Sequence, residues 1–266
     1  MFEINYQNGM NTILKSTVWV KKYTQLDSQA ELRLFCLPYA GGSSQIYRDW
    51  MNHLSRKIEL CPIELPGRGS RLNEAPITDL STLVQEIALG IHHYLDRPFA
   101  FFGHSMGALL SFELTRLLRQ QGYPSPAHLF VSGYRAPQLK SDSTLIHNLP
   151  EPEFTEEIRQ LGGTPEAVLA NAELRELVFP ALRADFAAIE TYRYRPCTSL
   201  VCPITVFGGL QDRGVDVADL EAWRQHTTGK FGLQMFSGNH FFLHQVQPLI
   251  LQVIDRQLSD VRKLCK

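Results

Sequence analysis

One serine in this chain lies in a pattern that is typical of a nucleophile. Ser105 is the central residue of GHSMG (103–107), which matches the G-x-S-x-G pattern of a nucleophile elbow. A short apolar run (99–102) precedes this segment and a helical pattern (108–120) follows it, as the sharp turn from strand to helix requires. Small residues flank the serine because the strained turn brings backbone segments close together. We therefore expect Ser105 to be a nucleophile, the alternative being a glycine-rich turn with an incidental serine.

A serine hydroxyl is a weak nucleophile at neutral pH and needs a base that is oriented by an acid. After an elbow of this kind the acid follows along the chain, and the histidine follows the acid. Asp212 comes just after a predicted buried strand, and His240 comes between the last predicted strand and the last predicted helix. Asp216 and Asp219 are alternatives on the same loop, although their positions are more typical of solvated or helix-capping residues. We expect Asp212 to be the acid and His240 the base.

The other histidines fit the role of the base less well. His104 adjoins the nucleophile but is expected to point elsewhere, and His226 and His244 are expected on helix surfaces. His240 and His244 have the i, i+4 spacing of two zinc ligands on one helix face. No glutamate follows His240 directly, as it does in the H-E-x-x-H motif. We therefore predict no metal site.

Hydrolysis through a tetrahedral intermediate also needs two backbone N–H groups where the negative charge develops. One is supplied by the residue after the nucleophile, here Met106, and the other by the loop after an early strand, here PYAGG (38–42). The glycines of that loop would let the backbone approach a substrate closely. The alternative is that Gly41 and Gly42 simply form a turn that ends the strand.

Predicted strands and helices alternate along most of the chain. Apolar runs predict strands at 32–37, 58–65, 99–102, 127–132, 202–207 and 232–236. Apolar residues at helical spacing predict helices at 43–55, 81–95, 108–120 and 247–259. This alternation implies βαβ units and a mainly parallel sheet flanked by helices, an α/β fold.

The stretch from 138 to 194 breaks the alternation because it contains helical patterns only, at 153–161, 165–171 and 173–192. We expect a helical insertion that covers the C-terminal edge of the sheet; ordinary crossover helices are the alternative. Since predicted strands lie on both sides of it, the chain, residues 1–266, is expected to be one domain, with residues 1–30 as a polar lead-in.

Composition excludes several classes of partner. The 266 residues contain 26 Lys+Arg and 27 Asp+Glu, a net charge of −1, which leaves no basic excess to bind nucleic acid. No apolar run is long enough to cross a membrane, and the N-terminus has no basic segment followed by an apolar one, as in a secretory signal. The five cysteines are widely spaced and odd in number, which is not a disulfide framework. We predict a cytoplasmic protein.

Six segments carry the motifs described above. In chain order they are LFCLPYAGGSS (34–44), ELPGRGSR (64–71), FFGHSMGALLSFEL (101–114), ITVFGGLQD (204–212), LEAW (220–223) and GNHFFL (238–243). Together they resemble type II thioesterases, the stand-alone α/β-hydrolases that accompany polyketide synthases and nonribosomal peptide synthetases. PYAGG and LPGRGSR are not general to α/β-hydrolases, which makes the resemblance specific. The medium-chain acyl thioesterases of animal fatty acid synthase share most of these motifs.

The resemblance implies an α/β-hydrolase fold whose helical insertion is a lid over an acyl pocket. It implies Ser105 as nucleophile, Asp212 as acid, His240 as base, and the N–H groups of Ala40 and Met106 as oxyanion donors. No cofactor is needed. The substrates would be acyl groups on the phosphopantetheine arm of acyl- or peptidyl-carrier proteins, with no nucleic-acid or membrane partner.

The chain departs from the family pattern in two places. Arg213-Gly214-Val215 follows the acid where family members often have a proline-containing turn, and the first 15 or so residues have no counterpart. Three other functions use the same features: a carboxylesterase or lipase, an acyltransferase, and a non-catalytic module that binds carriers. Because carrier proteins are commonly acidic, a docking patch is expected at Arg68, Arg71 and the arginines of the insertion.

Overall fold

The protein is built around one six-stranded sheet. In the computed structural model, which describes residues 19–23, 30–139 and 145–264, the strand order is β2-β1-β3-β4-β5-β6 and each neighbouring pair is parallel. The strands are β1 (Leu32–Leu37), β2 (Ile58–Pro62), β3 (Phe99–His104), β4 (His128–Ser132), β5 (Ile204–Gly209) and β6 (Phe231–Phe236). The predicted strands are all present, and the predicted α/β fold is confirmed.

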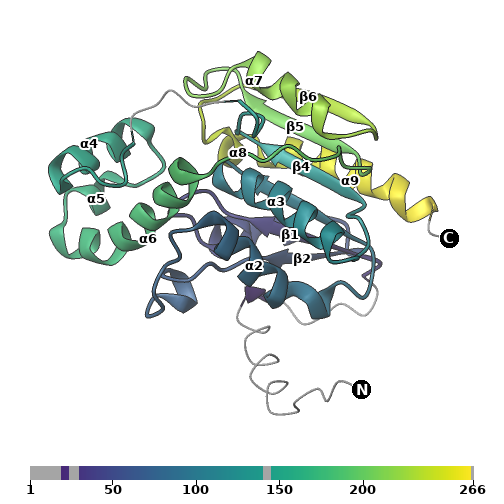
Figure 1. Cartoon of the computed structure of the whole chain (residues 1–266), viewed down its shortest axis with the longest axis horizontal. Coiled ribbons are helices and arrows are strands. Elements are labelled where there is room, and N and C mark those ends of the chain that lie inside the picture. The colour runs from purple at the N-terminus through teal and green to yellow at the C-terminus, as the bar shows by residue number, and fades with distance from the viewer. Residues whose placement is uncertain (1–18, 24–29, 140–144, 265–266) are drawn as a thin grey trace, which may run out of the picture.

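Helices cover both faces of this sheet (Figure 1). The main ones are α2 (Leu80–Ile91) and α3 (Met106–Gln120) on one face, and η1 (Ser44–Asn52) and α9 (Gln247–Leu264) on the other. Successive residues of a strand enter opposite cores, as Phe101 packs with α2 and α3 whereas Phe102 packs with η1 and α9. Burial on both faces explains why the central strands are nearly continuous apolar runs.

The insertion between β4 and β5 contains only helices in its described part. They are α4 (Glu151–Leu161), α5 (Glu166–Leu169) and α6 (Ala172–Thr191), and Figure 1 shows them gathered at one side of the sheet. They have an apolar cluster of their own, which includes Phe154, Ile158 and Phe179. This separate cluster favours the predicted insertion over ordinary crossover helices, although the C-terminal part of α6 also packs against the main core through Ala188.

The remaining described elements are short. They are η2 (Gly69–Arg71), η3 (His92–Tyr94), α7 (Val217–Glu221), η4 (Ala222–His226) and α8 (Phe242–Gln245). Three predicted elements differ from those observed. The helix predicted at 43–55 is the 3-10 helix η1, and the one predicted at 81–95 ends at Ile91 and continues as η3. The strand predicted at 58–65 ends at Pro62, since Ile63 forms an antiparallel bridge with Val20.

Part of the predicted N-terminal lead-in belongs to the core. Trp19 and Val20 are 2% and 3% exposed, and the Trp19 ring lies over the position where a side chain at Gly90 would be. The guanidinium of Arg71 stacks on the Trp19 ring at 4.0 Å from its centroid. Residues 1–18 and 24–29 lie outside the described residues. Across the described part of the chain, no helix has the length and apolar character needed to span a membrane.

The expectation that His226 lies on a helix surface is wrong. His226 is 5% exposed and its ring packs against those of Phe112 and Trp223. Its Nε2 is hydrogen-bonded to the side-chain oxygen of Gln138, and burial lowers the pKa of His226 to about 4. The helix η4 is short and packs inward, which a helical pattern alone does not reveal. His244, by contrast, is exposed as expected.

The turn between β3 and α3 is tightly packed, which gives a testable consequence. A Cβ at Gly103 would lie 1.9 Å from the carbonyl oxygen of Gly107, a backbone atom that cannot move aside. We expect Gly103→Ala to lower the free energy of unfolding by about 3 kcal/mol, as overpacking of a core does. Urea denaturation measures this. The control is Gly232→Ala, whose Cβ would be 3.9 Å from its nearest neighbour, Thr205. Equal stability of the two variants would contradict the packing described here.

Candidate active site

Ser105 lies at the strand-to-helix turn that the motif predicts. β3 ends at His104 and α3 begins at Met106, with Ser105 between them at φ 53° and ψ −119°. Among the described residues it is the one non-glycine with positive φ, a conformation that costs about 1–3 kcal/mol. The backbone holds it there, because the Ser105 N–H donates to the carbonyl of Ser132 at 2.7 Å. The turn therefore presents the serine beyond the end of the sheet.

Asp212 and His240 are brought together by the ends of β5 and β6. Nδ1 of His240 and Oδ2 of Asp212 are 2.7 Å apart. The other carboxylate oxygen, Oδ1, accepts the N–H of Gly214 at 2.9 Å, so the loop after β5 fixes the acid in place. Asp212 is buried, with its side chain 3% exposed, whereas that of His240 is 27% exposed. This arrangement commits Nδ1 of His240 to the acid and leaves Nε2 for other chemistry.

Asp216 and Asp219, the alternatives to Asp212, form a capping box at the start of α7. The Asp216 carboxylate accepts the N–H of Asp219 at 2.8 Å, and the Asp219 carboxylate accepts the N–H of Asp216 at 3.3 Å. Both carboxylates therefore satisfy the first turn of a helix, as the sequence indicated.

Ser105, Asp212 and His240 line one cavity of about 1000 Å³. The insertion supplies most of its apolar wall, namely Leu145, Leu161, Phe186 and Ile189. Within the described residues no hydrogen bond joins the side chains of Ser105 and His240, although both border this space. The cavity thus joins the end of the sheet to the insertion, and an apolar chain would fit against its wall.

His104 points away from this cavity, as expected. Its side chain is fully buried, its Nδ1 is 2.8 Å from the hydroxyl of Ser132, and its ring centroid is 5.2 Å from that of His240. Burial and then the charge of His240 lower the pKa of His104 well below its usual range. His104 is therefore neutral at pH 7 and adds no positive charge beside His240.

Some backbone N–H groups of the loop after β1 are hydrogen-bonded within the protein and others are not. The N–H of Gly41 donates to Asp185 at 2.7 Å, and the N–H of Gly42 donates to the carbonyl of Tyr39 at 2.9 Å. The N–H groups of Ala40 and Met106 have no acceptor within the part of the chain that the structure describes. These are the two donors that the resemblance implied, and neither is occupied by the protein's own carbonyls.

Among the described residues that line the cavity, the formal charge is positive on balance. They include three arginines, Arg135, Arg193 and Arg213, and two carboxylates, those of Glu190 and Asp212. Glu190 is already bound, because its carboxylate accepts the N–H groups of Ile146 and His147 and pairs with the His147 ring. An anionic group on a ligand would therefore find complementary charge here.

The prediction of a docking patch at Arg68 and Arg71 is wrong. The two arginines are 6% and 7% exposed, because each is bound by internal acceptors. Arg68 forms an ion pair with Asp185 on α6, and Arg71 forms one with Glu74 and also donates to the carbonyl of Glu64.

Asp185, the partner of Arg68, was not predicted from the sequence. Its signal was an acidic residue set among apolar residues of a predicted helix.

The two histidines with zinc-like spacing lie in different environments. His240 is bound to Asp212, whereas Nε2 of His244 is 3.1 Å from the hydroxyl of Tyr39. Among the described residues, no group of three His, Cys, Asp or Glu side chains could hold a metal ion.

Comparison with known proteins identifies relatives over nearly the whole chain. The family model described as Thioesterase domain matches residues 32–258. The gramicidin S biosynthesis protein GrsT of Aneurinibacillus migulanus is 45% identical over 236 residues, which are 89% of this chain and 92% of that protein.

Two solved structures are also similar. RedJ, the thioesterase of the prodiginine pathway of Streptomyces coelicolor, is 41% identical with a TM-score of 0.81, and the match covers 86% of this chain and 91% of RedJ. BorB, the type II thioesterase of the borrelidin biosynthetic cluster, is 37% identical with a TM-score of 0.83, and the match covers 91% and 98%. These likenesses confirm the expected α/β-hydrolase fold.

The different roles of Asp212 and Asp216 can be distinguished by mutation of Asp216. Asp216→Ala removes a helix cap and is expected to cost about 1 kcal/mol of unfolding free energy. Because Asp216 does not contact His240, turnover of an acyl thioester is expected to remain close to that of the wild type. Urea denaturation and initial rates measure the two effects. A large loss of turnover in the folded variant would show that the wrong aspartate had been assigned.

Proposed function

The chain belongs to the thioesterase family, and from that premise we propose that it hydrolyses acyl thioesters on the phosphopantetheine arm of acyl- or peptidyl-carrier proteins. Its relatives support this substrate class, since GrsT is named for gramicidin S biosynthesis, RedJ for the prodiginine pathway and BorB for the borrelidin cluster. The proposed task is to release or remove acyl groups during polyketide or nonribosomal peptide synthesis. The cytoplasmic location stays a prediction from the sequence.

The observation that carries the mechanism is the 2.7 Å contact between His240 Nδ1 and Asp212 beside the strained Ser105. With Nδ1 protonated and held by the acid, Nε2 of His240 is the basic nitrogen. It takes the Ser105 proton as the hydroxyl oxygen attacks the thioester carbonyl carbon. The C–S bond then breaks, and the proton on His240 passes to the leaving pantetheine sulfur. An acyl group is left on Ser105.

The second half of the reaction uses the same residues with water as the nucleophile. His240 takes a proton from water, the hydroxide attacks the acyl carbon, and the proton returns to the Ser105 oxygen as the carboxylic acid leaves. In both halves the negative oxygen is bound by the unoccupied N–H groups of Ala40 and Met106. Each such donor typically stabilises the transition state by about 3–4 kcal/mol. No cofactor takes part.

The lining of the cavity supports a long substrate with two unlike ends. Apolar residues of the insertion would cover the acyl chain, as a lid does. Arg135, Arg193 and Arg213 would attract the phosphate of the arm, because the carboxylates nearby are already bound. The docking of an acidic carrier would then depend on these cavity arginines instead of on Arg68 and Arg71.

The proposed function is tested by substrate choice. We expect hydrolysis of acyl-pantetheine thioesters and acyl-carrier proteins in preference to oxygen esters with the same acyl chain. Ser105→Ala is expected to reduce turnover by a factor on the order of 10⁵ and to prevent labelling by a fluorophosphonate, with an unchanged circular dichroism spectrum.

Each competing function predicts a different result. A preference for the oxygen ester would indicate a carboxylesterase or lipase, and transfer of the acyl group to an added alcohol or amine would indicate an acyltransferase. Turnover retained by Ser105→Ala, or a wild type that neither reacts with fluorophosphonate nor hydrolyses any acyl carrier, would contradict the proposal.

The role of the cavity arginines is tested by comparing substrates with and without the phosphate of the pantetheine arm. Arg193→Ala is expected to raise the KM for an acyl-phosphopantetheine about fivefold, since one charge contact with phosphate is lost. The KM for the same acyl-pantetheine, which lacks the phosphate, is expected to stay the same. The matched control is Arg175→Ala, an arginine of α6 that pairs with Glu151 outside the cavity. An equal effect on both substrates would contradict phosphate recognition.

A further inference from the structure

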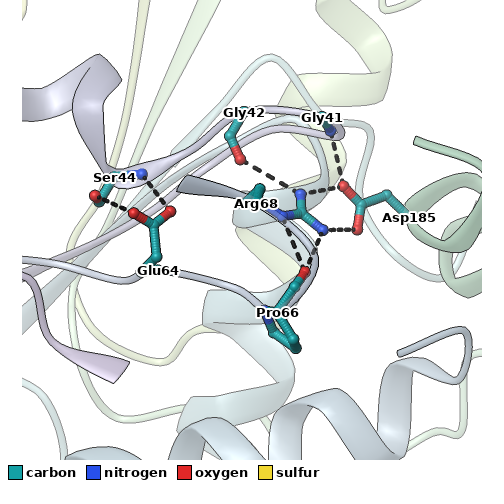
Figure 2. Close-up of polar contacts among 7 residues, drawn as sticks. All are labelled: Gly41, Gly42, Ser44, Glu64, Pro66, Arg68 and Asp185. Carbon is teal, nitrogen blue, oxygen red and sulfur yellow. Dashed lines mark hydrogen bonds and ion pairs between the residues drawn. The ribbon is translucent and has the colours of Figure 1, made fainter. Parts of the chain in front are cut away.

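One buried carboxylate joins the helical insertion to the loop after β1. Asp185, on α6, is 1% exposed and accepts the N–H of Gly41 at 2.7 Å. It also pairs with both terminal nitrogens of Arg68, at 2.5 Å and 2.8 Å. Figure 2 shows the carboxylate in contact with both the Gly41 N–H and the guanidinium. Three segments far apart in the sequence therefore meet at one side chain.

Arg68 holds the same loop from the other side. Its Nη1 donates to the carbonyl of Gly42 at 3.4 Å, and its Nε and Nη2 donate to the carbonyl of Pro66 at 3.3 Å. The Gly41-Gly42 pair thus has one N–H bound by Asp185 and one carbonyl bound by Arg68 (Figure 2). The guanidinium is held in one orientation, because its N–H donors bind backbone carbonyls and one carboxylate.

The end of the loop is fixed separately, by Glu64. This buried carboxylate accepts the N–H of Ser44 at 3.1 Å and its hydroxyl at 2.8 Å. Since Glu64 belongs to the segment after β2, it holds Ser44 independently of the insertion. The Tyr39 ring anchors the start of the loop against His104 and Phe241, and the middle of the loop is held by the groups that bind Gly41 and Gly42.

The backbone at Gly41 is shaped to fit α6. Gly41 has φ +75°, and a Cβ there would lie 2.5 Å from Leu182, one turn before Asp185. Only glycine allows both the left-handed conformation and the close approach of this helix. The loop is therefore in contact with α6 through packing as well as through the carboxylate.

These bonds determine the direction of the Ala40 N–H. The N–H of Ala40 and the carbonyl of Tyr39 belong to one planar peptide unit. That carbonyl accepts the N–H of Gly42 at 2.9 Å, and the next peptide unit is held through Gly41 N–H by Asp185. If the acceptor on α6 were lost, the Gly41 peptide unit would lose its bond, and the Ala40 N–H would be held only by the bond from the Gly42 N–H to the Tyr39 carbonyl.

We propose that Asp185 is a positioning residue for the reaction: by accepting the Gly41 N–H it holds the Ala40 N–H toward the developing oxyanion, so that this half of the oxyanion hole is supported by the helical insertion. This inference rests on the proposed function, because it uses Ala40 as a donor. Arg68 keeps the Asp185 carboxylate in place and balances its charge. The insertion then contributes to the chemical step as well as to the acyl pocket.

The test compares two double variants that both remove the ion pair. Arg68→Met/Asp185→Asn keeps an oxygen that can accept the Gly41 N–H, and Arg68→Met/Asp185→Leu has nearly the same side-chain shape without an acceptor. Removing both charges together avoids leaving one of them buried and unpaired. For acyl-pantetheine hydrolysis, we expect kcat of the leucine variant to be about 100-fold lower than that of the asparagine variant, as for the loss of one oxyanion donor, with similar KM.

A second readout separates positioning from general damage to the structure. A trifluoromethyl ketone with an acyl-like chain forms a tetrahedral adduct with a serine, so its inhibition constant is expected to rise by the same factor as kcat falls. A non-reacting amide analogue is expected to bind both variants equally. If the leucine variant does not fold, Arg68→Met/Asp185→Ala replaces it, because a smaller side chain removes the acceptor without crowding.

The outcomes are distinct. Equal kcat and equal ketone inhibition in the two folded double variants of an active wild type would overturn the role of Asp185. Equal and large losses in both would also overturn it, since they would assign the effect to the ion pair instead of the acceptor. A wild type that hydrolyses no acyl thioester would contradict the proposed function itself, whatever the double variants do.

Discussion

The buried carboxylate of Asp185 is the interaction on which the geometry of the candidate site most depends. It replaces water around one N–H of the loop after β1 and around one guanidinium, and it does so from a helix of the insertion. Burying charges is costly unless they are paired and hydrogen-bonded, and removing one partner of such a pair typically costs about 3–5 kcal/mol. Here the carboxylate and the guanidinium bind each other, and each also binds one backbone group of the loop, the N–H of Gly41 and the carbonyl of Gly42. The same free energy that holds the insertion against the sheet thus also fixes the loop.

The other half of the site depends on backbone strain. Ser105 has a positive φ between β3 and α3, and glycines two residues to either side of it let the strand and the helix meet. The strain is maintained by the sheet, through the bond from Ser105 N–H to the Ser132 carbonyl of the neighbouring strand. The proposed donor at Met106 therefore comes from a rigid element, whereas the proposed donor at Ala40 comes from a loop that is held from outside. This difference explains why a side chain of the insertion is placed at Gly41.

The parts of the site that could be predicted from sequence are those with local signals. Ser105 lies between a short apolar strand and a helical pattern, and Asp212 and His240 each follow a strand, so their positions at one edge of a parallel sheet follow from chain order. The pair formed by Arg68 and Asp185 could not be predicted in this way, because its partners are 117 residues apart and no local pattern joins them, although the apolar neighbours of Asp185 indicate that it is buried. Arg68 was expected in a docking patch for an acidic carrier, and the segment around it does not show the carboxylate that binds it. The burial of His226 was missed because two of the three aromatic rings around it, those of Phe112 and Tyr194, come from distant parts of the chain.

The most direct measurement is a crystal structure of the protein after reaction with an alkyl fluorophosphonate, whose tetrahedral phosphorus mimics the intermediate. We predict that phosphorus is bonded to the Ser105 oxygen and that one phosphoryl oxygen lies about 2.7–3.1 Å from both the Ala40 and the Met106 nitrogen. Asp185 should still accept the Gly41 N–H, with the alkyl chain against the apolar wall of the insertion. Modification of another residue, or a phosphoryl oxygen directed away from these two N–H groups, would contradict it.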